Sequence, residues 1–102
     1  MGQRIELLGT DIVGEVAIFD TDRSLSGMEG ETYATLDETR ARSTYPAGLA
    51  ERLMLADGSI RLVYVYSNAL SVSRAGGWTD SAIARVASEI TNFFIVYAEN
   101  KS

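Results

Sequence analysis

The sequence predicts an α+β fold, with an antiparallel sheet of about five or six short strands and one long C-terminal helix packed on one face. Three observations support this. Short apolar runs separated by turn residues fill the chain up to Arg74. The dipeptide Asp57-Gly58 between two such runs predicts a hairpin. The only long helical periodicity lies from Trp78 to Asn100. The length fits a single domain, residues 1–102.

The N-terminal part, residues 3–19, is predicted to form a hairpin. Its first strand is Arg4–Leu8, its turn is Gly9–Asp11, and its second strand is Ile12–Phe19. Gly14 within the second strand indicates a bulge or a close backbone approach. The acidic residues Glu6 and Glu15 are expected to face solvent.

A loop is expected over Asp20–Gly30, followed by a strand over Glu31–Leu36 and then irregular chain. The segment Thr35–Glu38 also matches a capping box, which starts helices. A helix over 36–44 would lack an apolar stripe, however, and Tyr45–Gly48 is interpreted as a break.

The hairpin around Asp57-Gly58 joins Glu51–Ala56 to Ser59–Tyr66 through a type I′ turn. Counting from that turn pairs Leu55 with Ile60 and Leu53 with Leu62 on the face toward the helix. Tyr64 and Tyr66 continue this face, whereas Val63 and Val65 point the other way beside Arg61. After a turn at Ser67-Asn68, Ala69–Arg74 is the last predicted strand.

The C-terminal helix starts at Thr79, Asp80 and Ser81, whose side chains can accept hydrogen bonds from the first N–H groups. Its apolar stripe comprises Ile83, Val86, Ala87, Ile90, Phe93, Phe94 and Tyr97. A shorter helix followed by a strand over 93–98 is the alternative. The continuous helix is favoured because no Gly or Pro interrupts the segment.

Composition limits the function. The formal charge of −5 and the pI near 4.6 argue against nucleic-acid and anionic-membrane partners. With no Cys and no His, the chain lacks thiol nucleophiles, imidazole bases and the usual zinc ligands. No catalytic residue, cofactor or metal is therefore assigned. No apolar run reaches the length of a membrane span, and a cytoplasmic location is expected.

The segment Val16–Leu25 resembles the first motif of haloacid-dehalogenase-type phosphatases, and Leu62–Asn68 looks like their second motif. The resemblance implies that Asp20 attacks phosphorus, that Asp22 is the acid/base, and that Mg²⁺ holds the phosphate. It also implies parallel strands and a downstream lysine. The only lysine here is Lys101.

The same acidic loop fits part of a calcium-binding pattern. Asp20, Asp22, Ser24 and Glu31 occupy its first, third, fifth and twelfth positions. Leu25 stands where the pattern needs Gly, and an apolar strand precedes the loop where a helix belongs. We therefore expect a solvated acidic loop without a tight metal site.

Five aromatic residues are candidates for an apolar ligand site between sheet and helix: Tyr64, Tyr66, Trp78, Phe94 and Tyr97. The simpler interpretation places them in the core, because so small a domain needs them for stability. The favoured function is a non-enzymatic binding protein that acts as a homo-oligomer, with a small apolar molecule or another protein as further partners. The alternative is a small carboxylate enzyme of the phosphatase kind, using Asp20 and Asp22.

The oligomer is predicted from unmatched apolar surface. Ile95 and Val96 leave the last helical turn without a polar side, and Val63 and Val65 give the sheet a second apolar face. The helix over 79–99 is expected to contribute to the contact. In the intramolecular alternative, Tyr45–Leu49 folds over the helix end.

Overall fold

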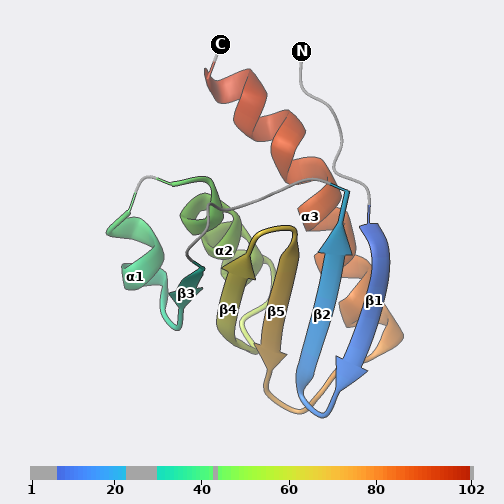
Figure 1. Ribbon diagram of the computed structural model, residues 1–102. Helices are drawn as coiled ribbons and strands as arrows, with labels where there is room; N and C mark the ends of the chain where they lie inside the picture. The colour runs from blue at the N-terminus through green and yellow to red at the C-terminus, as the bar shows by residue number, and fades with distance from the viewer. Residues whose placement is uncertain (1–6, 23–29, 43, 102) are drawn as a thin grey trace.

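The computed structural model describes residues 7–22, 30–42 and 44–101, with side chains as far as residue 93. In chain order the elements are β1 (Leu7–Val13), β2 (Val16–Thr21), β3 (Glu31–Tyr33), α1 (Leu36–Arg40), α2 (Tyr45–Ala56), β4 (Ile60–Tyr66), β5 (Ala69–Arg74) and α3 (Asp80–Lys101). The strands form one antiparallel sheet in the order β1-β2-β5-β4-β3 (Figure 1). This confirms the predicted α+β fold.

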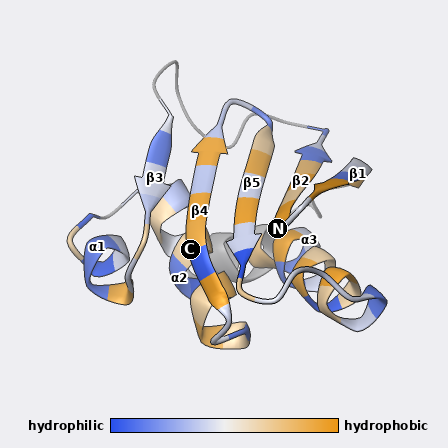
Figure 2. Cartoon of the chain, turned by 90° about the horizontal axis from the view of Figure 1, so that it is seen from below, coloured by the Kyte–Doolittle hydropathy of each residue, from blue (hydrophilic) through white to orange (hydrophobic). Residues whose placement is uncertain are grey.

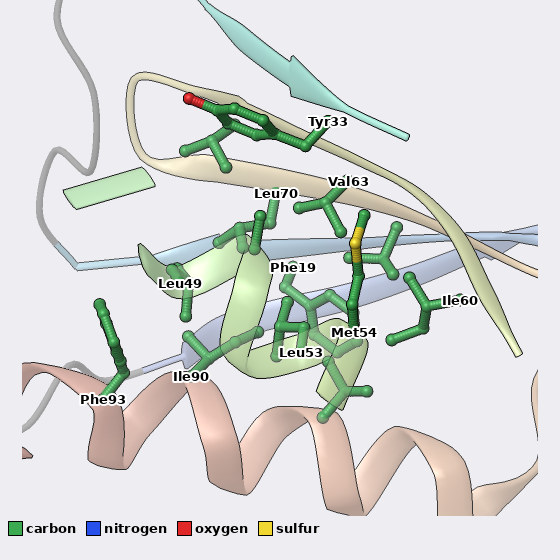
Figure 3. Close-up of a cluster of buried hydrophobic side chains, with 14 of the residues drawn as sticks. Phe19, Tyr33, Leu49, Leu53, Met54, Ile60, Val63, Leu70, Ile90 and Phe93 are labelled. Carbon is green, nitrogen blue, oxygen red and sulfur yellow. The ribbon is translucent and has the colours of Figure 1, made fainter. Parts of the chain in front are cut away.

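All three helices of the described ranges lie on the same side of the sheet (Figure 2). The core forms between them and the inner sheet face, where side chains of the central strands meet α2 and α3 (Figure 3). Its largest fully buried members are Phe19, Leu49, Leu53, Leu70 and Ile90. Burial of this much apolar surface is the main stabilising contribution to the fold.

The N-terminal hairpin is present, but the predicted turn is wrong. Gly9–Asp11 lies within β1, and the chain turns between Val13 and Val16. Gly14 occupies this turn at a φ of +62°, where a side chain is strained. Glu15 is exposed, as expected, whereas Glu6 lies outside the described residues.

The expected irregular chain after β3 is also wrong, because Leu36–Arg40 forms the helix α1. The Thr35 hydroxyl accepts a hydrogen bond from the Glu38 amide, and the Glu38 carboxylate accepts one from the Ala34 amide. The first contact is that of a capping box. The second differs by one residue, because a capping-box glutamate would accept from the amide of Thr35 rather than from that of Ala34. The cap starts a short helix without the apolar stripe that a longer one would need.

The largest correction concerns the hairpin predicted around Asp57-Gly58. Residues 45–56 form the helix α2, so Leu55 does not pair with Ile60, nor Leu53 with Leu62. The Thr44 hydroxyl caps this helix by accepting a bond from the Ala47 amide. Pro46 lies in the first turn, where its missing N–H costs nothing.

The faces of β4 are the reverse of those predicted. Val63 and Val65 are fully buried in the core, whereas Leu62, Tyr64 and Tyr66 are exposed on the far face. A register shift between Ile60 and Leu62 causes part of the difference, because it leaves both Ile60 and Val63 pointing inward. Such a bulge inverts the alternation after it.

The helix α3 confirms the continuous C-terminal helix. Thr79 caps it, accepting a hydrogen bond from the Ala82 amide. Val86, Ile90 and Phe93 of the predicted stripe are buried, and the Phe93 ring lies 5.0 Å from Tyr45 of α2 in an edge-to-face arrangement. The intramolecular cover expected as an alternative, from residues 45–49, therefore reaches this part of α3. Within the described ranges, none of the helices combines the length and the apolar content of a membrane span.

Asp57 joins four elements at one end of the molecule. It is 5% exposed, and its carboxylate accepts hydrogen bonds from Arg74 Nε at 2.7 Å and from the Ser59 amide at 2.9 Å. Arg85 of α3 lies 3.8 Å away. Burial alone raises the pKa of Asp57, but these partners outweigh it and hold the pKa below its ordinary value of 3.8.

Candidate interaction surface

The outer face of the sheet carries exposed apolar side chains that the described helices leave open. Cross-strand pairing defines three rows on this face. The first row contains Val13, Val16, Ser73 and Leu62; the second contains Asp11, Ile18, Ser71, Tyr64 and Thr32; the third contains Gly9, Asp20, Ala69 and Tyr66. We call the part formed by β2, β5 and β4 the open face.

One side of the open face is a raised line of large side chains on β4. Leu62, Tyr64 and Tyr66 alternate along this strand and are all exposed. The two tyrosine rings are parallel, 2° apart, with centroids separated by 6.3 Å. Tyr64 also lies over Gly30, where an added Cβ would come within 2.7 Å of its ring. The Tyr64 ring therefore has both Tyr66 and Gly30 as neighbours.

Beside this line, β5 contributes only small side chains. Ala69, Ser71 and Ser73 pair with Tyr66, Tyr64 and Leu62 respectively. Because β5 lies between β4 and β2 in the sheet, a strip of small residues runs between two lines of larger ones. Val16 and Ile18 form the line on the β2 side. The surface therefore has relief as well as apolar character.

The three rows contain few charged side chains, although exposed Arg61 adjoins Leu62 on β4. In the three rows, the only ionisable carboxylates are those of Asp11 and Asp20. The central positions carry hydroxyl, methyl and aromatic groups. Depletion of charge at the centre with a polar rim is typical of protein interfaces, in which tyrosine is enriched.

The predicted ligand site between sheet and helix is not assembled as expected. Tyr64 and Tyr66 lie on the face away from the helices. Trp78 packs edge-on against Phe19 at 5.9 Å, and its indole N–H donates to the Glu15 carbonyl at 2.9 Å. The side chains of Phe94 and Tyr97, like those of Ile95 and Val96, lie outside the described residues.

The acidic pair Asp20 and Asp22 comes from the end of β2. Asp20 belongs to the open face, and Asp22 follows the strand and is exposed. Both sheet neighbours of β2 are antiparallel to it, which differs from the parallel arrangement that the phosphatase resemblance implies. In the described part of the chain, no three acidic side chains gather in a way that could hold a metal ion. Ser24 and most of the predicted calcium loop fall outside that part.

Sequence reasoning identified the two tyrosines but missed their neighbours. Leu62 is predicted on the face toward the helix, and no role is predicted for the serines of β5. The alternation of Ala69, Ser71 and Ser73 with the buried Leu70 and Val72 does predict that β5 has a polar outer face. What it does not reveal is that β5 lies between two strands with large outer residues.

The class of protein defined by these features is a small α+β domain with a half-covered antiparallel sheet. No known protein family matches the chain, and no curated protein matches it in sequence. Among solved structures, the chain is similar to the protein SAV1430 from Staphylococcus aureus, with a TM-score of 0.64 and 10% sequence identity. The match covers 82% of this chain and 96% of the other. At this identity the likeness shows a shared fold and nothing about activity.

Proposed function

We propose that the protein is a non-enzymatic interaction protein that acts as a homodimer, and that two copies meet through their open faces. The observation that carries the proposal is the exposed line Leu62, Tyr64 and Tyr66 on a sheet whose described helices all cover the other face. Contiguous exposed apolar surface of this kind usually marks an interaction site. A cytoplasmic location stays a prediction.

The relief of the open face supports a second copy as the occupant. A two-fold axis parallel to the strands, between β4 and β5, places β4 of each copy over β5 of its partner. The large side chains of Leu62, Tyr64 and Tyr66 then meet the partner's strip of small residues. A two-fold contact requires self-complementarity of this type, and face-to-face sheets pack about 10 Å apart, so their side chains interdigitate.

Charge supports the same location. Two copies that each carry a formal charge of −5 repel one another, so a stable contact needs a region without like charges at its centre. The row positions on β5 and β4 meet this condition, because Asp11 lies on β1 and Asp20 on β2. The expected contribution of α3 to the contact stays a prediction, since the side chains of Ile95 and Val96 lie outside the described residues.

The test compares two substitutions that each replace an exposed apolar side chain by a carboxylate. Tyr66 on the open face is 48% exposed, and Leu55 on α2 is 62% exposed. Sedimentation equilibrium of the wild type at tens of micromolar should give a dimer. Tyr66→Glu should shift the equilibrium to folded monomer, because two carboxylates would be desolvated near the axis. Leu55→Glu should leave the dimer intact.

Circular dichroism of both variants confirms that they remain folded. A wild-type monomer at these concentrations would refute the proposal. Equal dissociation by both substitutions would place the contact elsewhere and refute the assignment to the open face.

A further inference from the structure

A cavity of about 340 Å³ lies between β3 and the segment that begins with α1. Four consecutive residues, Gly30 to Tyr33, line one side of it, and Glu38, Ala41 and Arg42 line the other. Glu38 belongs to α1, Ala41 is its C-cap, and Arg42 directly follows. The volume of the cavity falls in the range of natural ligand pockets. We call this cavity the β3–α1 groove.

The residues of β3 show where the groove lies relative to the strand. Thr32 belongs to the outer face of the sheet, whereas Glu31 and Tyr33 pair with the inward residues Val65 and Val63. A cavity lined by residues of both faces lies along an edge of the strand, since successive side chains alternate. β4 occupies one edge of β3, so the groove follows the other edge, which no described strand pairs with.

An acidic group is held in fixed orientation in this groove. The side chain of Glu31 is only 15% exposed, and its Oε1 accepts hydrogen bonds from the Tyr33 hydroxyl and, at 2.7 Å, from the Thr44 hydroxyl. Burial and the contact with Glu31 raise the pKa of Tyr33, so its hydroxyl keeps its proton and continues to donate. Two hydrogen-bond donors on Oε1 restrict the rotamers of the Glu31 side chain. They therefore also fix the orientation of its second carboxylate oxygen, Oε2.

The groove carries net negative charge. Glu31 and Glu38 contribute two carboxylates, and Arg42 contributes one guanidinium. Arg42 is 61% exposed and lies 3.9 Å from Glu31, a distance at which an exposed pair adds little stability. Arg42 is therefore only a weak competitor when a ligand cation enters the groove and binds the Glu31 carboxylate.

From these features we infer that the β3–α1 groove binds an extended peptide segment, which adds as a strand along the free edge of β3 and places a basic side chain against Glu31 and Glu38. Strand addition supplies backbone hydrogen bonds, and the pockets for alternate side chains supply specificity. β3 is three residues long, so about three peptide residues, or roughly 10 Å, match its edge. The inference does not rest on the proposed dimer, although Gly30 and Thr32 of the groove adjoin Tyr64 of the open face.

The experiment titrates the protein with blocked pentapeptides and follows backbone amide chemical shifts. The first peptide is acetyl-Thr-Val-Arg-Val-Thr-amide, and the second has Glu in place of Arg. The arginine peptide should bind with a Kd below about 1 mM and shift the amides of residues 30–33 and 38–42. The glutamate peptide should bind at least about tenfold more weakly, as expected for a lost charge-assisted hydrogen bond.

Two variants and one small probe sharpen the result. Glu31→Gln keeps an acceptor for both hydroxyls but removes the charge, so it should weaken the arginine peptide about tenfold. Glu51→Gln removes a carboxylate from α2 outside the groove and should have no effect. Equal binding of both peptides, binding by neither, or shifts confined to other residues would overturn the inference. Agmatine binding as tightly as the peptide would overturn strand addition in favour of a simple cation site.

Discussion

Asp57 offers the sharpest test of how the fold is held together. Asp57→Ala removes the carboxylate that accepts from Arg74 and from the Ser59 amide. Removing one partner of a buried ion pair lowers the free energy of unfolding by about 3–5 kcal/mol. The remaining Arg74 guanidinium keeps its bond to the Gly77 carbonyl at 2.8 Å and its position over the Trp78 ring. Because Arg74 keeps these contacts, we expect a loss below that range, about 2–3 kcal/mol in the free energy of unfolding.

The assay is urea denaturation at pH 7, followed by circular dichroism, with thermal unfolding alongside. A loss of this size corresponds to a fall in Tm of roughly 10–20 °C for a domain of this length. Arg85→Ala is the graded control. Arg85 is half exposed and 3.8 Å from the same carboxylate, so its loss should cost less than about 1 kcal/mol.

Acid provides a second measurement on the same group. The folded-state pKa of Asp57 lies below its ordinary value of 3.8, so the unfolded chain takes up the proton first. The stabilisation is therefore fully present above that ordinary value and is lost as the pH falls through the folded-state pKa. The difference between wild type and Asp57→Ala should shrink in this range. A loss under about 1 kcal/mol at pH 7, or a difference that does not change with acid, would refute the reasoning.

Two further predictions concern the corrected turns and faces. Gly14→Ala should destabilise the protein by about 1 kcal/mol or more, because Gly14 has a φ of +62°, whereas Gly58→Ala should change stability by under about 0.5 kcal/mol. Equal urea midpoints for the two variants would contradict this. Val63→Ala should cost about 2 kcal/mol and Leu62→Ala under about 1 kcal/mol, since only Val63 is fully buried. The opposite order in the same denaturation series would restore the original assignment of faces.

The helix α2 shows why a strong local signal misled. Asp-Gly between apolar runs is typical of a hairpin, but here Asp57 ends a helix, and its amide donates to the Leu53 carbonyl at 3.0 Å. The side-chain carboxylate of Asp57 accepts a hydrogen bond from the Ser59 amide. This contact forms an Asx turn that leads into β4. Both roles suit Asp, so the dipeptide alone did not decide between hairpin and helix end. The apolar spacing of Ala50, Leu53 and Met54 carried the helical signal.

Gly48 shows how tertiary contacts outweigh local preference. Glycine disfavours helices, and together with Pro46 it indicated a chain break. In the structure an added Cβ at Gly48 would approach the Phe93 ring to 3.1 Å. A small residue there lets α2 pack closely on α3. That advantage depends on an element 45 positions further along the chain, counting from residue 48 to residue 93, and no local pattern contains it.

Other elements were predictable because several local signals agreed. In β5, buried Leu70 and Val72 alternate with serines, and the turn residues Ser67-Asn68 precede the strand. In α3, the Thr79 cap and the 3.6-residue period both point to a helix. β4 lacks such agreement, since Leu62, Val63, Tyr64 and Val65 are apolar in succession. This continuous apolar run indicates a strand but does not show which of its two sides faces the core. That choice depends on the geometry of the turn before it.

The error in β4 changes the site of the proposed function without removing its basis. Apart from Ile95 and Val96, the prediction of an oligomer depended on an argument that is independent of register: β4 is apolar on both sides, and the described helices cover only one face of the sheet. Exchanging the two sides sends the valines into the core, under α2, and sends Leu62 and the tyrosines outward. Aromatic residues with a polar tip suit a surface that alternates between water and a partner better than valine does. The exchanged arrangement therefore gives the open face a stronger interface composition than the one predicted.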